Sequence, residues 1–170
     1  MGEGHEPLYE INMNLPSRET PIFRKAEEIY QALRTITDLF PEDNDYLQHL
    51  KSNLLGDSMI IQAKISGAQA VRLYDIKMEN AAIIRKAARD IMVGGNNLSA
   101  FGFSDASYYT IIRNLIEEFR ILFVEWVSQF NPKHFIVDDW GLFNPPGIST
   151  DYIQRDDELN FLDEDDDDEL

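Results

Sequence analysis

Three histidines and no cysteine limit the metal and nucleophile chemistry open to this chain. Without cysteine there is no disulfide framework, thiolate zinc site, iron–sulfur cluster or cysteine nucleophile. A di-iron site in a helical bundle needs glutamates together with Glu-x-x-His pairs. None of His5, His49 and His134 stands three residues after a glutamate on a predicted helix. We therefore expect no metal site and no cofactor.

Other catalytic signatures are missing from the sequence as well. A HEPN-type ribonuclease would need a histidine shortly after an arginine, and neither Arg113 nor Arg120 is followed by one. There is no Gly-x-Ser-x-Gly elbow, no Gly-x-Gly-x-x-Gly turn and no P-loop. Composition alone leaves a Ser–His–Asp triad open, but no motif supports one. The sequence thus predicts no catalytic residue and a protein that is not an enzyme.

A run of basic residues is the clearest candidate for a binding surface. Its members lie off the apolar face of a predicted helix: Lys77, Arg85, Lys86 and Arg89. Such a stripe can follow a phosphate backbone, and it can equally bind the acidic face of a protein. The negative charge of the chain opposes attraction of nucleic acid at long range. A solvated helix face, paired with acids such as Glu79 or Asp90, is the simpler interpretation.

The net charge of −16 is concentrated at the C-terminal end. Of the 170 residues, the first 150 hold 20 acids and 14 bases, whereas residues 151–170 hold 11 acids and one arginine. Residues 163–169 are seven consecutive acids, and such a run repels itself and stays extended. We expect residues 151–170 to form a flexible acidic tail, which either solubilises the protein or docks on a basic partner.

Two helices are predicted in the first half of the chain. Thr20 is a favourable N-cap, Pro21 suits the first helical position, and the next proline ends this helix. Asn44 or Asp45 can cap the second helix, which ends either near residue 67 or near residues 74–75. The apolar residues recur every three or four positions, as one helix face requires: Ile22, Ala26, Ile29, Leu33, Ile36 and Phe40, then Leu47, Leu50, Leu54, Ile61, Ile65 and Ala68.

Two more helices follow, at about 76–93 and 106–130. The third carries Ala81, Ile84, Ala88 and Ile91 on one face. We expect Gly94-Gly95-Asn96-Asn97 to close it, because these residues tolerate positive φ. The fourth is apolar over more than half of its circumference, so it is either the most buried helix or one that also faces a partner subunit.

The segment after the fourth helix contains proline and glycine yet stays rich in large apolar side chains, which disordered segments lack. We therefore divide the chain into an N-terminal extension (1–19), a bundle (20–131), an ordered irregular segment packed on the bundle or on a neighbouring subunit (132–150), and the tail (151–170). The predicted fold class is all-α: an antiparallel up-and-down four-helix bundle with an irregular C-terminal extension and an acidic tail. No secretory signal or membrane span is visible, so we expect a cytoplasmic protein without membrane contact.

Residues 22–130 resemble a group of small bacterial four-helix-bundle proteins. The resemblance rests on the stop at Phe40-Pro41, the run from Lys51 to Gly67, and the third-helix segment IIRKAARDIMV. The group includes the protein encoded in intervening sequences of bacterial 23S rRNA genes and the accessory protein of diversity-generating retroelements. The resemblance implies a non-enzymatic oligomer. Within the group, the retroelement accessory protein binds a reverse transcriptase and nucleic acid. This chain differs in being acidic and in carrying an extra C-terminal segment.

These observations favour an oligomeric scaffold or adaptor that acts through protein–protein contacts with copies of itself and with an unidentified protein. Its predicted interface residues are large and apolar, as interface centres often are: Phe123, Trp126, Trp140, Leu142 and Phe143. The alternative is a nucleic-acid or ribonucleoprotein accessory protein that uses the basic stripe. If Trp126 belongs to the core instead, its loss should unfold the body, whereas loss of Trp140 should weaken assembly alone.

Overall fold

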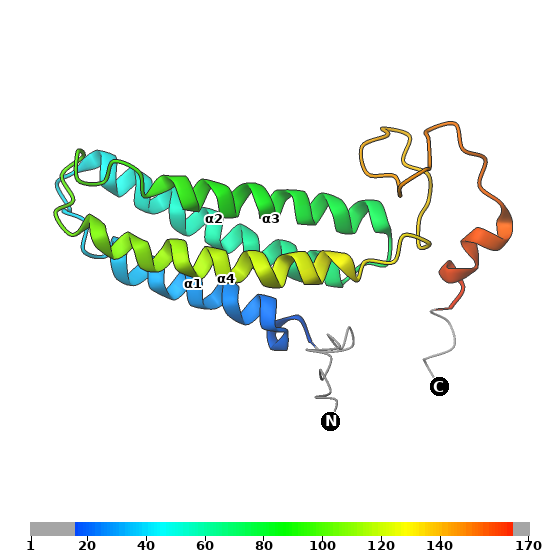
Figure 1. Cartoon of the computed structure of the whole chain (residues 1–170), viewed down its shortest axis with the longest axis horizontal. Helices are drawn as coiled ribbons and strands as arrows, with labels where there is room; N and C mark the ends of the chain where they lie inside the picture. Colours follow the sequence, from blue (N-terminus) through cyan, green and yellow to red (C-terminus); the bar gives the residue numbers. More distant parts are fainter. Residues whose placement is uncertain (1–15, 165–170) are drawn as a thin grey trace, which may run out of the picture.

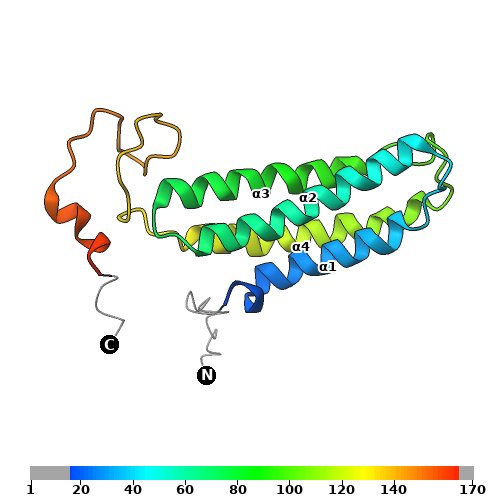
Figure 2. The same cartoon turned by 180° about the vertical axis from the view of Figure 1, so that it is seen from behind.

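The predicted all-α fold is confirmed by a computed structural model, which describes residues 16–164. Four long helices make up the body: α1 (Pro21–Thr37), α2 (Asp45–Gln69), α3 (Tyr74–Gly94) and α4 (Tyr109–Ser128). Consecutive helices run in opposite directions (Figure 1). α1 packs against α2 and α4, and α3 packs against the same two helices, so the four form a closed bundle (Figure 2). Residues 16–164 contain no strand.

In the described part of the chain, three short 3₁₀ helices flank the long ones: η1 (Ser17–Glu19), η2 (Ala106–Tyr108) and η3 (Asp156–Leu162). Within residues 16–164, no helix is both long enough and apolar enough to span a bilayer. Of the predicted N-terminal extension, residues 1–15 lie outside the described residues.

The predicted starts of the first two helices are confirmed by their caps. The Thr20 hydroxyl accepts a hydrogen bond from the Phe23 N–H at 3.4 Å. Asn44, rather than Asp45, caps α2: its side-chain oxygen accepts from the Leu47 N–H at 3.1 Å, and its amide nitrogen donates to the Phe101 carbonyl at 2.7 Å. This second bond ties the α1–α2 connection to the loop that follows α3.

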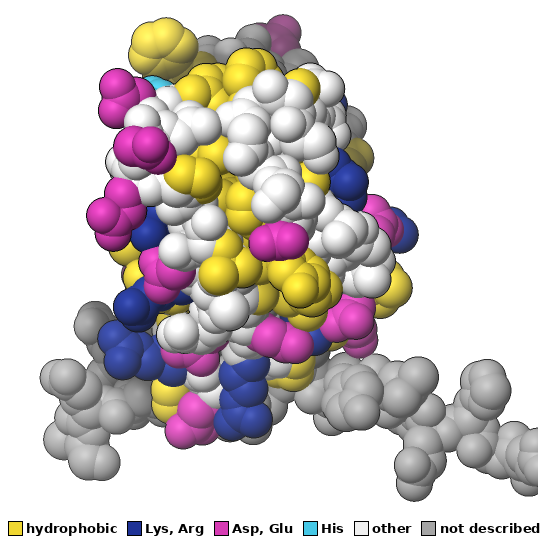
Figure 3. Space-filling view, turned by 90° about the vertical axis from the view of Figure 1, so that its left-hand side faces the viewer, with side chains coloured by type: hydrophobic (Ala, Val, Ile, Leu, Met, Phe, Trp, Pro, Cys, Tyr) yellow, Lys and Arg dark blue, Asp and Glu magenta, His cyan; other side chains and the backbone are white. Residues whose placement is uncertain are grey.

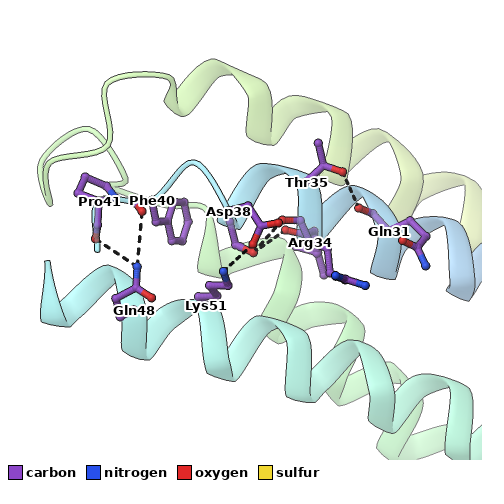
Figure 4. Close-up of polar contacts among 10 residues, drawn as sticks. Gln31, Arg34, Thr35, Asp38, Phe40, Pro41, Gln48 and Lys51 are labelled. Atoms are coloured by element: carbon purple, nitrogen blue, oxygen red, sulfur yellow. Dashed lines mark hydrogen bonds and ion pairs between the residues drawn. The ribbon is translucent and has the colours of Figure 1, made fainter. Parts of the chain in front are cut away.

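The corner between α1 and α2 is held by two side chains of α2 that bind Asp38, the residue after α1, and the Pro41 carbonyl (Figure 4). The Lys51 ammonium lies 2.6 Å from the Asp38 carboxylate, and its hydrogen bond lowers the pKa of that carboxyl. The Gln48 amide donates to the carbonyl of Pro41 at 3.1 Å. Figure 3 shows this end of the bundle, where apolar side chains are exposed among charged and uncharged polar groups. The rings of Tyr46 in α2 and Phe101 in the loop after α3 stack with centroids 4.0 Å apart.

The turn between α2 and α3 lies at the later of the two predicted positions. Helix α2 runs through Gly67 and ends at Gln69, and α3 begins at Tyr74. A Cβ on Gly67 would lie 3.2 Å from the Asn80 side-chain oxygen. Gly67 therefore marks a close approach of α2 and α3 rather than a helix end.

The core follows the predicted helix faces closely. Every predicted core position of α1 and α3 is buried, and in α2 only Leu50 is partly exposed. Helix α4 supplies the bulkiest groups. Tyr109, Phe119 and Trp126 are almost fully buried, and Trp126 packs edge-on against Phe130 with ring centroids 4.8 Å apart.

The residues beyond 150 depart from the flexible tail expected there. Residues 131–164, called the C-terminal arm below, extend past the end of the bundle along its long axis and turn back through η3 (Figures 1 and 2). Phe161 is buried and stacks on the His134 ring at 4.8 Å, and Arg72 donates to the Phe161 carbonyl at 3.3 Å. An aromatic anchor thus orders the chain up to the acidic run, of which residues 165–169 lie outside the described residues.

Candidate protein-binding site

Two surfaces of the described chain have the chemistry of a contact site. One is the turn at residues 138–144 of the C-terminal arm, called the knob below. The other is a groove between α3 and α4, called the α3–α4 groove, whose lining is given below. Together they contain six of the nine predicted site residues: Trp140, Leu142 and Phe143 in the knob, and Arg85, Arg89 and Phe123 in the groove.

Asp138 organises the knob. One carboxylate oxygen accepts from the Trp140 N–H at 3.0 Å, and the other accepts from the N–H groups of Leu142 at 3.0 Å and Phe143 at 3.2 Å. These bonds lower the pKa of the Asp138 carboxyl, the one from Phe143 most of all. Asn144 completes the turn, since it accepts from the Asp138 N–H at 2.7 Å and donates to the Asp138 carbonyl at 3.0 Å.

Gly141 allows the turn to be this tight. It has a φ of +70°, and a Cβ at this position would lie 2.7 Å from the Thr150 methyl carbon. Behind the turn, Gln154 joins the two sides of the arm: it donates to the Phe135 carbonyl at 2.6 Å and accepts from the Val137 N–H at 3.3 Å. The knob is therefore fixed mainly by hydrogen bonds between its backbone and the side chains of Asp138 and Asn144.

The knob holds two of the predicted interface residues in solvent. Trp140 is 95 % exposed and Leu142 is 73 % exposed, whereas Phe143 is half-buried. An exposed leucine alone would be unremarkable, whereas an almost fully exposed tryptophan on an ordered turn makes the knob a candidate contact surface.

The α3–α4 groove is a hollow of about 420 Å³ along the two neighbouring helices that pack least closely. Its floor is apolar and is made by Ala88, Met92, Ile116, Phe119 and Phe123. Its rim carries Val124, Glu117 and three arginines, namely Arg85, Arg89 and Arg120. Arg120 pairs with Glu117 at 2.9 Å, whereas no acidic side chain among residues 16–164 lies within ion-pair distance of Arg85 or Arg89.

The prediction that Trp126 is an interface residue is wrong for this surface. Trp126 is 0 % exposed and lies in the core of the bundle. Its position on α4 shares one helix face with Phe119, so the sequence pattern did not separate core from interface. Phe123, three residues earlier, is half-buried and forms part of the groove floor.

The predicted basic stripe is also incomplete. Arg85 and Arg89 are exposed, and Lys86 pairs with Asp90, as the simpler interpretation anticipated. Lys77 is only 7 % exposed, so it is not part of any surface stripe. Its ammonium donates to the Ala68 carbonyl in the last turn of α2 at 2.6 Å and lies 5.3 Å from the Phe130 ring centre. Lys77 thus satisfies a helix-end carbonyl that has no further helical N–H available.

Lys77 should make the stability of the protein depend on pH. Burial lowers its pKa from the ordinary 10.5, so between the folded pKa and 10.5 the unfolded chain binds more protons than the folded chain. Stability should therefore rise with pH across that window. Lys77→Met should lose this rise when urea unfolding is followed at a series of pH values. Lys64→Met, at a partly exposed lysine of α2, is the control and should keep the wild-type slope.

The sequence analysis did not find Asp138, Asn144, Gln154 or Arg120. An aspartate two residues before a Trp-Gly pair is a signal for a side-chain-capped turn, and it could have identified Asp138. Nothing in the sequence indicates that Arg120 of α4 would join two arginines of α3. Within residues 16–164, no cluster of three or more His, Cys, Asp and Glu side chains has a geometry that could hold a metal ion. His5 lies outside the described residues.

No protein-family model, curated protein or solved structure matches this chain.

Proposed function

We propose that this chain is a cytoplasmic, non-enzymatic, homo-oligomeric scaffold or adaptor that works through protein–protein contacts. The observation that carries the proposal is the knob, which holds Trp140 in solvent on a turn fixed by Asp138. A pre-organised aromatic side chain suits binding, because the entropy of ordering the turn has been lost before the partner arrives. Tryptophan is also enriched among the residues that dominate binding energy.

Helix α4 supports the same function. It buries one face in the core, and three aliphatic side chains on its outer side are more than half exposed: Ile111, Ile121 and Val124. Exposed apolar groups that gather on one element mark interaction surfaces. A relation to the bacterial four-helix-bundle family is part of this proposal, and the bundle architecture over the resembling stretch supports it.

The mass of the native particle tests the proposed function. Native mass spectrometry of the full chain, purified gently from its own host, should show a multiple of 19.6 kDa. Additional mass from a bound protein would identify the partner. A 19.6 kDa particle that stays monomeric at high concentration would contradict self-association.

Asp138→Asn should weaken self-association severalfold without unfolding the bundle. An amide has one acceptor oxygen where the carboxylate has two, so asparagine cannot accept from the Trp140 N–H on one side and from the Leu142 and Phe143 N–H groups on the other. The knob is then held less firmly in its shape. Asp139→Asn is the matched control, since it removes the same charge from the adjacent exposed residue. Sedimentation velocity over a concentration series compares them. Equal weakening in both variants would show that charge, and not the shape of the turn, matters.

The same aspartate should make self-association depend on pH. The pKa of Asp138 is below its ordinary value in the folded chain. The hydrogen bonds that the ionised carboxylate accepts therefore hold the knob at neutral pH. They are lost as pH falls through that lowered pKa, and self-association should weaken with them.

A nucleic-acid accessory role is the second candidate, favoured by the three arginines that meet on one groove. It requires salt-sensitive binding of RNA or DNA that Arg85→Glu/Arg89→Glu abolishes. The floor between these arginines is apolar and offers a phosphate backbone no hydrogen-bond donor, so the groove as a whole suits a protein ligand better.

A further inference from the structure

The knob and the α3–α4 groove are complementary surfaces of one chain. The knob offers exposed apolar side chains on an acidic segment, and the groove offers an apolar floor inside a cationic rim. We propose that the knob of one copy docks in the α3–α4 groove of a second copy. This inference rests on the proposed function, because it names the contact through which the scaffold assembles.

The chemistry of the groove fits the two side chains of the knob. Met92 and Phe123 on the floor are only partly buried, so they can receive the indole of Trp140 and the isobutyl group of Leu142. Arg85 and Arg89 stand on the rim, where a guanidinium can lie over the face of an indole, an attractive arrangement. Tryptophan and arginine are among the residue types enriched in binding hot spots.

Charge favours the C-terminal arm as the occupant. The arm carries eight acidic residues against one lysine and one arginine, and Asp138 and Asp139 directly precede Trp140. Complementary potentials steer association and reject partners of the wrong sign. A contact between two α3–α4 grooves would instead bring the arginines of both copies together, which argues against a symmetric pairing of this face.

Geometry makes the contact intermolecular. The arm lies beyond the end of the bundle in both views (Figures 1 and 2), while the groove runs along α3 and α4. Trp140 is almost fully exposed, so it does not reach the groove of its own chain. Because knob and groove are different surfaces, the contact is head-to-tail, and repeating it gives a closed ring or an open filament.

Two variants test the contact, each altering one surface only. Trp140→Ala/Leu142→Ala removes the knob and leaves the groove intact. Arg85→Glu/Arg89→Glu reverses the rim and leaves the knob intact, and all four residues are exposed, so both variants should fold. Each should weaken self-association roughly tenfold or more. Arg24→Glu/Arg34→Glu, which reverses two exposed arginines of α1, is the charge-matched control and should assemble like the wild type.

Mixing the two variants gives the decisive measurement. The groove of the knob-less variant can still accept the knob of the rim-reversed variant, and no second contact can then form. An equimolar mixture should therefore give a dimer of twice 19.6 kDa in light scattering, although each variant alone is monomeric. Circular dichroism and unfolding midpoints verify that both variants are folded.

Other outcomes separate the failure of this inference from that of the proposed function. If the rim-reversed variant still assembles, or the mixture stays monomeric, the groove does not receive the knob, while self-association through the knob stands. If the wild type is itself monomeric and instead binds RNA in a salt-sensitive way through Arg85 and Arg89, both the inference and the proposed scaffold are overturned.

Discussion

Replacing Trp126 by alanine should destabilise the bundle by about 3–5 kcal/mol, the range found for large aromatic residues in cores. Trp126 is 0 % exposed and packs edge-on against Phe130, so alanine at this position leaves a cavity in the core. Since a domain is stable by roughly 5–15 kcal/mol in total, this is a large fraction of its stability. Urea unfolding at low protein concentration measures the loss, because assembly would add to apparent stability.

Two other tryptophan variants are controls for Trp126→Ala. Trp140→Ala should change stability by less than about 0.5 kcal/mol, as surface substitutions usually do. Trp126→Phe should cost less than Trp126→Ala, because it keeps a ring in the core. It also removes an indole N–H for which residues 16–164 offer no acceptor. If Trp126→Ala and Trp140→Ala destabilised the protein equally, the assignment of one tryptophan to the core and the other to assembly would be wrong.

Much of the fold could be predicted because helix formation leaves local signals. The residue that caps a helix lies within three residues of the N–H that it binds, so Thr20 and Asn44 can be recognised from their neighbours alone. The three-to-four-residue spacing likewise identifies which side of each helix is buried. The spacing cannot tell a buried position from one at a subunit interface, since both are apolar, and Trp126 was misassigned for this reason.

The contact surface was harder to predict because it depends on residues that are distant along the chain. The groove combines Arg89 of α3 with Arg120 of α4, and no local pattern places these together. The sequence pattern predicted Lys77 to be part of an exposed stripe, but the end of α2 and the Phe130 ring cover this side chain. In the arm, Phe161 looked like part of a flexible acidic tail, and only its stacking on His134 shows that the segment is ordered.

The end of α3 at Gly94-Gly95 was predicted correctly, but the conformation expected of Gly95 was wrong. The residue was expected to close α3 through a positive φ, but its φ is −79°, and the residue of the predicted stop that does adopt a positive φ is Asn97. What the position requires is the absence of a side chain. A Cβ on Gly95 would lie 1.9 Å from a ring carbon of Tyr109. That ring is fully buried, and its hydroxyl donates to the Ile91 carbonyl at 2.5 Å.

Gly95→Ala should therefore destabilise the bundle by about 1–3 kcal/mol or more, the usual effect of overpacking a core. Tyr109 cannot move aside without breaking its bond to Ile91, which closes the last turns of α3. Gly56→Ala is the matched control, because a Cβ at that α2 position meets nothing within 4 Å. Alanine there should stabilise the helix by roughly 0.5–1 kcal/mol. Urea unfolding of the two variants should thus give shifts of opposite sign, and a stabilised Gly95→Ala would show that the Tyr109 ring does not fix this corner.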